Sequence, residues 1–196
     1  FAALSDQIEP IGPMPTLLPS TPLATPRGYK PASEMRRGDT VITRDDGTQV
    51  LRWVGKKTVQ AQGGFAPVLI RAGTFGAHGD LSVSPQHRVL VRGSMAELIS
   101  DGSELLTSAQ MLVDAGLAEV IESDGEVTYF HLLFDRHQLL WANGLETESY
   151  FPSDSTMDAF SEKAREEIYA LFPELRKTGE TAYGSVARRV ARWFEA

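Results

Sequence analysis

The chain has 196 residues, of which 42% are hydrophobic and 23% charged, a composition typical of one globular domain with at most an appendage. It contains no cysteine, which excludes disulfides, thiolate metal sites, iron–sulfur clusters and a thiol nucleophile. The net charge of −7 disfavours nucleic-acid partners, because their binding depends on Lys and Arg contacts to phosphates. No apolar run approaches the roughly 20 residues that span a bilayer, so we expect no membrane partner.

The chain opens with proline-rich sequence and continues as short β-prone runs. Prolines are frequent in the first 22 residues and predict an extended tether, because proline lacks a backbone donor and fixes φ. The β-prone runs are Thr40–Thr43, Gln49–Val54, Thr58–Gln60, Pro67–Arg71, Asp80–Val83, Arg88–Val91, Glu119–Ser123, Glu126–Phe134 and Leu139–Ala142. Asp124-Gly125 predicts a hairpin and Asn143-Gly144 a further turn, whereas Ser108–Asp114 has a helical pattern. This series of short β-prone runs separated by turn residues predicts a mainly β body.

The sequence after residue 152 has helical periodicity. Ser155-Thr156, followed by Asp158, predicts a helix start, and Pro173 ends that helix. Its apolar residues recur at helical spacing, at Ala159, Phe160, Ala164, Ile168, Leu171 and Phe172. A second helix is predicted over about Tyr183–Phe194, so we expect a two-helix appendage docked on the β body.

The histidines are the side chains expected to titrate near neutral pH. His78 lies in a predicted loop, and His87 ends a Ser-Pro-Gln-His turn that begins at Ser84. His131 and His137 flank Asp135 in a later strand region. Their spacing does not support a metal site, and the chain has neither a glycine-rich phosphate loop nor a Gly-x-Ser-x-Gly elbow. We therefore predict no metal and no cofactor.

Six segments occur together in a recognisable order. They are Leu23–Gly28, Met35–Val41, Arg52–Gly55, Val83–Leu90, Phe130–His137 and Trp141–Gly144. Together they resemble the Hint domain, the autoprocessing domain shared by inteins and hedgehog proteins. They look most like a bacterial subgroup often attached to secreted proteins with calcium-binding repeats. The resemblance covers about Thr16–Phe151 and implies a horseshoe-like β disc with pseudo-twofold symmetry and a central cleft.

The resemblance also implies a chemistry. In active relatives the first residue of the domain, a Cys or less often Ser or Thr, attacks the preceding carbonyl and converts an amide into a thioester or ester. Thr16 matches this position. Ser84 and His87 match the turn that polarises the scissile amide and protonates its leaving nitrogen, and Asp135 and His137 match a supporting block. The implied partner is the chain's own upstream polypeptide segment.

Two departures from the family pattern affect this chemistry. A Thr hydroxyl is a far weaker nucleophile than a thiolate, and the β-branched side chain is stiff at χ1. Ser20 and Thr21 are nearby hydroxyls, but using either would shift the register. After Asn143-Gly144 the sequence offers no terminal Asn that could cyclise, so C-terminal cleavage is not supported.

These observations leave three hypotheses. The first is a degenerate Hint domain, with weak or lost autoprocessing, that acts as a structural or interaction module. The second is slow autoproteolysis by an N–O acyl shift at Thr16, assisted by His87. The third is an unrelated all-β hydrolase or carbohydrate-binding domain that uses the histidines with Asp135. The predicted organisation is a tether over residues 1–15, a Hint-like domain over 16–151 and a helical appendage over 152–196.

Overall fold

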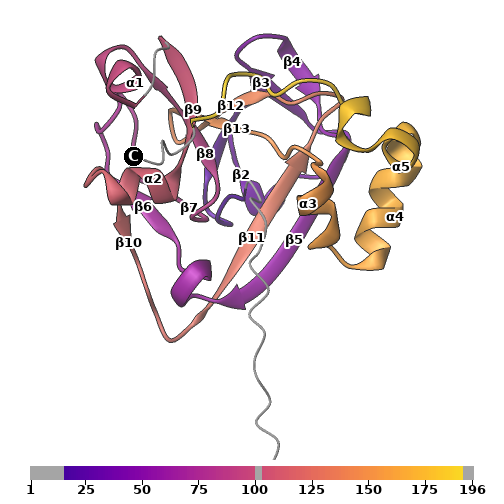
Figure 1. Ribbon diagram of the computed structural model, residues 1–196, viewed down its shortest axis with the longest axis horizontal. Coiled ribbons are helices and arrows are strands. Elements are labelled where there is room, and N and C mark those ends of the chain that lie inside the picture. Colours follow the sequence, from indigo (N-terminus) through magenta and orange to yellow (C-terminus); the bar gives the residue numbers. More distant parts are fainter. Residues whose placement is uncertain (1–15, 100–102, 192–196) are drawn as a thin grey trace, which may run out of the picture.

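The computed structural model describes residues 16–99 and 103–191, which form mainly antiparallel β-strands (Figure 1). The strands are β1 (Pro22–Thr25), β2 (Gly28–Pro31), β3 (Thr40–Thr43), β4 (Gly47–Val50), β5 (Trp53–Gln60), β6 (Val68–Ile70), β7 (Leu81–Val83), β8 (Arg88–Arg92), β9 (Glu104–Ser108), β10 (Glu119–Val120), β11 (Glu126–Leu133), β12 (Leu139–Ala142) and β13 (Leu145–Glu148). The helices are α1 (Ser94–Ile99), α2 (Ala109–Asp114), α3 (Asp154–Asp158), α4 (Glu162–Leu171) and α5 (Glu174–Thr178). The prediction of a mainly β fold is confirmed.

The largest sheet has eight strands. Six follow the order β2-β1-β12-β13-β8-β9, and β3 joins at β12 and carries β4 on its other side. One row of directly paired residues crosses five of the strands, from Thr43 through Leu140, Thr147 and Val89 to Thr107. Side chains paired directly across strands share one face, so this row presents three hydroxyls and two apolar groups to the interior.

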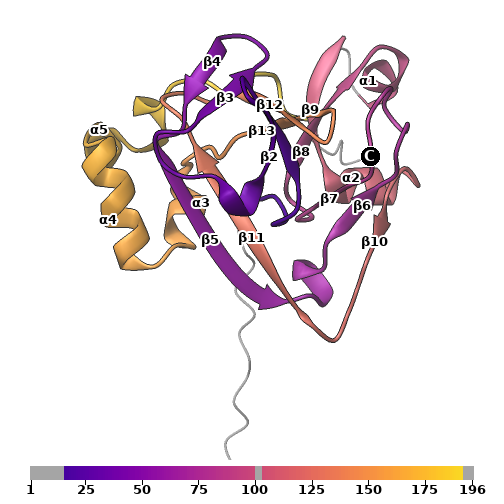
Figure 2. The same cartoon turned by 180° about the vertical axis from the view of Figure 1, so that it is seen from behind.

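Two smaller sheets complete the β body. One has the order β10-β6-β7, and the other is a ribbon in which β5 and β11 pair over eight residues each. Figure 2 shows β5 and β11 side by side, with α4 and α5 beyond them at one edge of the molecule and α1 and α2 at the opposite edge. The sequence predicted a hairpin at Asp124-Gly125, and this is wrong: β10 pairs with β6, whereas β11 pairs with β5. The turn instead bonds to Ala61, whose N–H donates to Gly125 and whose carbonyl accepts from Ser123.

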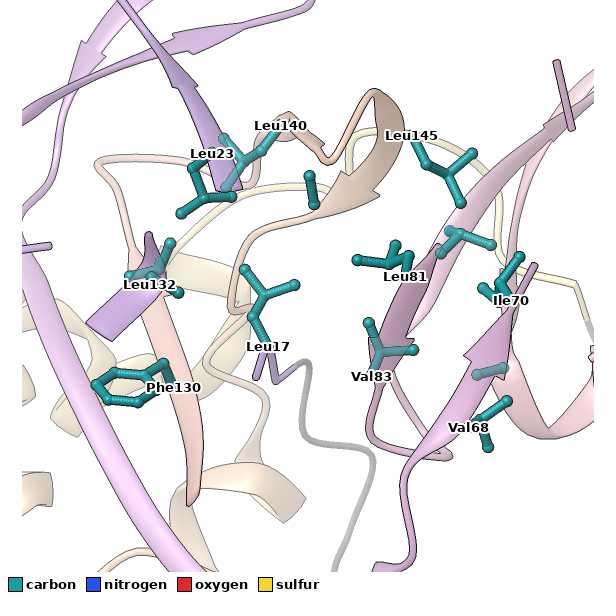
Figure 3. Packing of buried hydrophobic residues seen from close by; sticks show 14 of the residues in the cluster. Leu17, Leu23, Val68, Ile70, Leu81, Val83, Phe130, Leu132, Leu140 and Leu145 are labelled. Carbon is teal, nitrogen blue, oxygen red and sulfur yellow. The ribbon is translucent and has the colours of Figure 1, made fainter. Parts of the chain in front are cut away.

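Leu17 joins the two smaller sheets. It forms antiparallel bridges with both Val83 of β7 and Phe130 of β11. Its N–H donates to the Phe130 carbonyl at 3.0 Å, and its own carbonyl accepts from the Phe130 N–H at 2.8 Å. Figure 3 shows the Leu17 side chain between Phe130 and Leu132 on one side and Leu81 and Val83 on the other. Residues 1–15 of the predicted tether lie outside the described residues, whereas Thr16 and Leu17 are buried.

The predicted long helix near the C-terminus is two helices, α3 and α4. Each starts at its own serine cap, because the hydroxyl of Ser153 accepts from the Thr156 N–H and that of Ser161 accepts from the Ala164 N–H. Pro173 follows α4, as predicted, and α5 begins just after it. These helices cover the ribbon through a second apolar cluster, formed by Trp53, Leu133, Tyr150, Met157, Ile168, Leu175 and Tyr183.

The second predicted helix, over Tyr183–Phe194, is wrong for the part that the structure describes. Residues 183–191, here called the C-terminal strap, follow a short 3-10 turn (Gly179–Ala182) and run back to the eight-stranded sheet. Val190 forms a parallel bridge with Leu106 of β9. Backbone groups that a helix would pair internally are bonded to β9, since Leu106 N–H donates to Arg189 O and Ala191 N–H donates to Leu106 O. Residues 192–194 of that prediction lie outside the described residues.

Candidate functional site

Thr16 is the first described residue and is buried, with 3% of its surface exposed. Its carbonyl oxygen accepts a hydrogen bond from the Ser84 N–H at 3.4 Å. The next residue, Leu17, is fixed between β7 and β11, so the backbone after the Pro15–Thr16 peptide has a defined path. The Thr16 hydroxyl is buried and has no hydrogen-bond partner among the described residues.

The turn between β7 and β8 positions Ser84 and His87. The His87 N–H donates to the Ser84 carbonyl at 3.0 Å, which closes a four-residue turn with Pro85 at its second position, where proline is favoured. The start of α2 fixes the turn from outside, because the Ala109 N–H donates to His87 O and the Gln110 N–H donates to Pro85 O. The structure therefore brings Thr16, Ser84 and His87 together through one backbone network.

The His87 ring is fully enclosed and is held from β13. Its Nε2 contacts the Thr147 hydroxyl, which in turn donates to the Arg88 carbonyl at 3.2 Å. With its one proton used, the hydroxyl accepts from Nε2–H, and Nδ1 is left as a lone pair. Among the described residues, nothing donates to that Nδ1. Burial lowers the pKa of His87 to about 4, so the ring is neutral at pH 7.

Asp135 lies at the surface beyond the end of β11. Its carboxylate is 60% exposed and lies 3.5 Å from Nε of Arg52. Within the described part of the chain, no hydrogen bond or ion pair joins Asp135 to Thr16 or His87. Its assignment to a block that supports the site stays a prediction.

His137 is buried in a different set of contacts. Its Nε2 lies 3.0 Å from Oε2 of Glu148 and 3.1 Å from the Ser149 carbonyl, whereas its Nδ1 accepts from the Ala187 N–H at 2.9 Å. Since Nδ1 accepts, the ring is neutral with its proton on Nε2. His137 therefore connects β13 to the C-terminal strap, and its assigned supporting role at the site is also still a prediction.

Thr147 and Glu148 contact His87 and His137, and neither was predicted from the sequence. They are adjacent on β13, so their side chains face opposite sides of the sheet, Thr147 toward His87 and Glu148 toward His137. The second carboxylate oxygen of Glu148 accepts from Arg88 N–H at 3.0 Å and Nε at 2.7 Å. Burial alone would raise the Glu148 pKa, but bonds from His137 and the Arg88 charge outweigh it and hold that pKa below its usual value. The Asn143-Gly144 signal could have predicted the strand, but nothing local marks its partners.

The predicted turn at Asn143-Gly144 joins β12 to β13 and closes one side of a small polar hollow. Positive φ angles of 47° and 86° give it the hairpin geometry that favours this residue pair. The Asn143 amide donates to Asp80 O at 2.7 Å, and Asn143 O accepts from the Gly79 N–H at 2.9 Å. The hollow, of about 190 Å³, is lined by Leu18, Ser20, Thr21, Pro22, Asp80, Leu81, Ser82 and Asn143. It lies directly beside the segment that follows Thr16.

The remaining histidines lie elsewhere. His131 packs edge-on against Tyr150 and Phe160 in the aromatic cluster below the helices. His78 lies in the loop before β7, where its Nε2 accepts from the Phe75 N–H. Within residues 16–99 and 103–191, no group of three or more histidine, aspartate or glutamate side chains has an arrangement that could hold a metal ion.

Comparison with known proteins gives a family match. A family model described as "Hint domain" matches residues 15–154. Among solved structures, an intein-like domain from Clostridium thermocellum is 10% identical, with 70% of this chain and 99% of that chain covered at a TM-score of 0.47. The gp41-1 intein is 16% identical, with 67% and 96% covered at a TM-score of 0.42. No curated protein sequence matches significantly. None of the helices in the described ranges is long and apolar enough to cross a membrane.

Proposed function

We propose that this chain, which belongs to the Hint domain family, is a Hint domain whose self-cleavage is weak or lost and which acts as a structural or interaction module. The observation that carries the proposal is the state of His87. Thr147 holds its Nε2, and burial keeps the ring neutral with a pKa of about 4. The third hypothesis, an unrelated all-β hydrolase or carbohydrate-binding domain, is not retained because the family is established.

The reaction that we expect to be slow or absent is an N–O acyl shift. In that shift Oγ1 of Thr16 attacks the carbonyl carbon of Pro15, a C–O bond forms, and the C–N bond breaks. The hydroxyl proton is given up and the Thr16 nitrogen gains a proton to become an amine. A ring with a pKa of about 4 is protonated in only about one molecule in a thousand at pH 7, so His87 is a poor proton donor to that nitrogen. The Thr hydroxyl is in addition a poor nucleophile.

A second candidate function is slow autoproteolysis through the same shift. It is favoured by the Ser84 N–H on the Thr16 carbonyl and by the enclosed Nδ1 of His87, which has no partner among the described residues. On this alternative, that nitrogen takes the hydroxyl proton and later returns it to the amine. Water or hydroxylamine then cleaves the ester and releases residues 1–15.

Intact-mass measurement distinguishes the two candidates. We expect the wild-type protein to stay whole over days at several pH values, with or without hydroxylamine. We expect T16C to be cut by hydroxylamine before position 16 only slowly, because a thiolate supplies a better nucleophile while the neutral His87 still donates poorly to the leaving nitrogen. S20C is the matched control for the alternative register and is expected to stay whole.

Two results would contradict this proposal. Time-dependent loss of residues 1–15 from the wild type, abolished in Thr16→Ala, would establish slow autoproteolysis instead. Cleavage of S20C but not T16C would show that the nucleophile position is not Thr16.

The partner we propose for the module is its own upstream polypeptide, which an uncut chain keeps covalently attached. The net charge of −7 supports the absence of nucleic acid among its partners. A filter-binding titration with single- and double-stranded oligonucleotides at low salt tests this, and saturable binding would contradict it.

A further inference from the structure

The C-terminal strap occupies the outer edge of the eight-stranded sheet. Two backbone hydrogen bonds, Leu106 N–H to Arg189 O at 2.9 Å and Ala191 N–H to Leu106 O at 2.8 Å, add it to β9 as a parallel strand. Val190 and Ala187 pack on an apolar patch formed by Leu90, Leu106 and Leu139. The strap therefore covers both a strand edge and a hydrophobic surface, two features that favour association with other chains when exposed.

Polar contacts fix the strap at three further points. At its start, the Tyr183 hydroxyl donates to Phe134 O at 2.5 Å. In its middle, the Arg188 guanidinium donates to both Asp45 oxygens, at 2.9 and 3.0 Å, and to Glu104 at 2.9 Å. Asp45 is 38% exposed, and such partly solvated pairs contribute modestly. The third point is buried and involves His137.

The His137 contact depends on the protonation state of the ring. The Ala187 N–H donates to Nδ1 at 2.9 Å, and only a neutral imidazole offers a lone pair there. A protonated ring carries a hydrogen on Nδ1, so two donors would face each other within a buried site. The strap therefore loses its hydrogen bond from the Ala187 N–H when Nδ1 of His137 is protonated.

The other groups around the ring belong to the β body and not to the strap. Glu148 of β13 faces Nε2, Arg88 of β8 binds the same carboxylate, and the Phe151 ring packs edge-on at 5.4 Å. His87 lies across the sheet as a weak electrostatic neighbour, and Asp135 and Arg136 directly precede His137 in the sequence. On the strap, the charge of Arg188 is engaged by Asp45 and Glu104. Among the hydrogen bonds that the described residues make with the ring, the one at Nδ1 is the one that comes from the strap.

We propose that His137 is a proton-sensitive latch for the C-terminal strap. While the ring is neutral, it holds Ala187 and the strap covers the β9 edge. When the ring gains a proton on Nδ1, the strap detaches and exposes that edge together with Leu90, Leu106 and Leu139. This inference concerns the opposite face of the sheet from His87 and does not depend on whether the chain cleaves itself.

Hydrogen exchange tests the latch on the full chain. Exchange at the Ala187, Ala191 and Leu106 amides is measured at about pH 7.5 and about pH 5, corrected for intrinsic rates, with the Phe130 amide as a reporter of the core. We expect acid to reduce protection of the three strap amides at least about tenfold while Phe130 stays protected. H137Q, whose amide can donate to Glu148 but cannot gain a proton, is expected to show strap protection that does not change between the two pH values. H78Q removes a loop histidine and is expected to behave as the wild type.

Three results would overturn the latch. The first is equal strap protection at both pH values in the wild type. The second is loss of strap protection only together with Phe130, which would indicate global unfolding. The third is H137Q retaining the pH dependence of strap protection seen in the wild type.

Discussion

The imidazole of His87 and the hydroxyl of Thr147 contact each other inside the eight-stranded sheet, although 60 residues separate them in sequence. This contact fixes the ring tautomer from β13, and it ties the turn that carries Ser84 to the hairpin that follows Asn143. The geometry of the candidate site therefore depends on a residue outside the recognisable motifs.

Thr147→Val removes this contact without changing the side-chain volume. It leaves Nε2–H of His87 buried without an acceptor, so we expect a loss of about 1–3 kcal/mol in the free energy of unfolding, measured in urea. Thr107→Val is the matched control, since Thr107 is equally buried in the same residue row and its hydroxyl has no partner among the described residues. We expect it to be neutral or stabilising. Equal losses of unfolding free energy in both variants would show that the contact between His87 and Thr147 does not stabilise the fold.

Stability is expected to fall with acidification through His87. The unfolded ring has a pKa near 6.5 and the folded ring one of about 4, so the unfolded chain binds more protons between these values. The contribution of this residue is fully present above about pH 6.5, declines as the pH falls toward 4, and reaches about 3 kcal/mol in total. Urea midpoints measured across this range should fall more steeply for the wild type than for His87→Gln. Parallel profiles would contradict this pH dependence.

Glu148→Ala is expected to be among the most destabilising substitutions in the chain. It leaves Arg88 and His137 without their buried partner, and removing one member of such a network costs about 3–5 kcal/mol. Glu174→Ala is the control, because its pair with Lys177 is exposed and should contribute less than about 1 kcal/mol. Both are measured by urea unfolding at pH 7. A small effect of Glu148→Ala would mean that the network is solvated.

Gly55→Ala tests the packing of the ribbon against the aromatic cluster. A Cβ at this position would collide with the Trp53 ring, which lies over the glycine, so we expect a loss of about 1–3 kcal/mol. Gly64→Ala adds the same atom where nothing lies within 4 Å and is expected to be neutral or slightly stabilising. Thermal unfolding of both variants measures the difference. Equal midpoints would show that the Trp53 ring moves aside at no cost.

Local sequence signals predicted many of the strands but not their partners. β3 and β12 have the predicted bounds, because turn residues and β-branched runs act over a few positions. The hairpin at Asp124-Gly125 failed because β10 and β11 each find a partner earlier in the chain. The helix predicted from Tyr183 is wrong because the backbone of the strap forms hydrogen bonds with β9. This tertiary contact outweighs the helical spacing of the apolar residues.

In the candidate site, too, some residues could be predicted from the sequence and others could not. Ser84, His87 and the turn at Asn143 could be identified from motifs because each motif is contiguous. Thr147, Glu148 and Ala187 could not, because their roles arise from contacts across 60, 11 and 50 residues. A buried glutamate in an alternating strand looks the same in sequence as an exposed one.

The position of Thr16 between two sheets has a thermodynamic consequence for any cut before it. The product would begin with an α-ammonium group at a residue that is 3% exposed, within one residue of the bonds that join β7 to β11. Enclosing an unpaired cation costs several kcal/mol, and moving it to water would break the bonds of Leu17. We therefore expect a chain cut before Thr16 to be less stable toward unfolding than the joined chain.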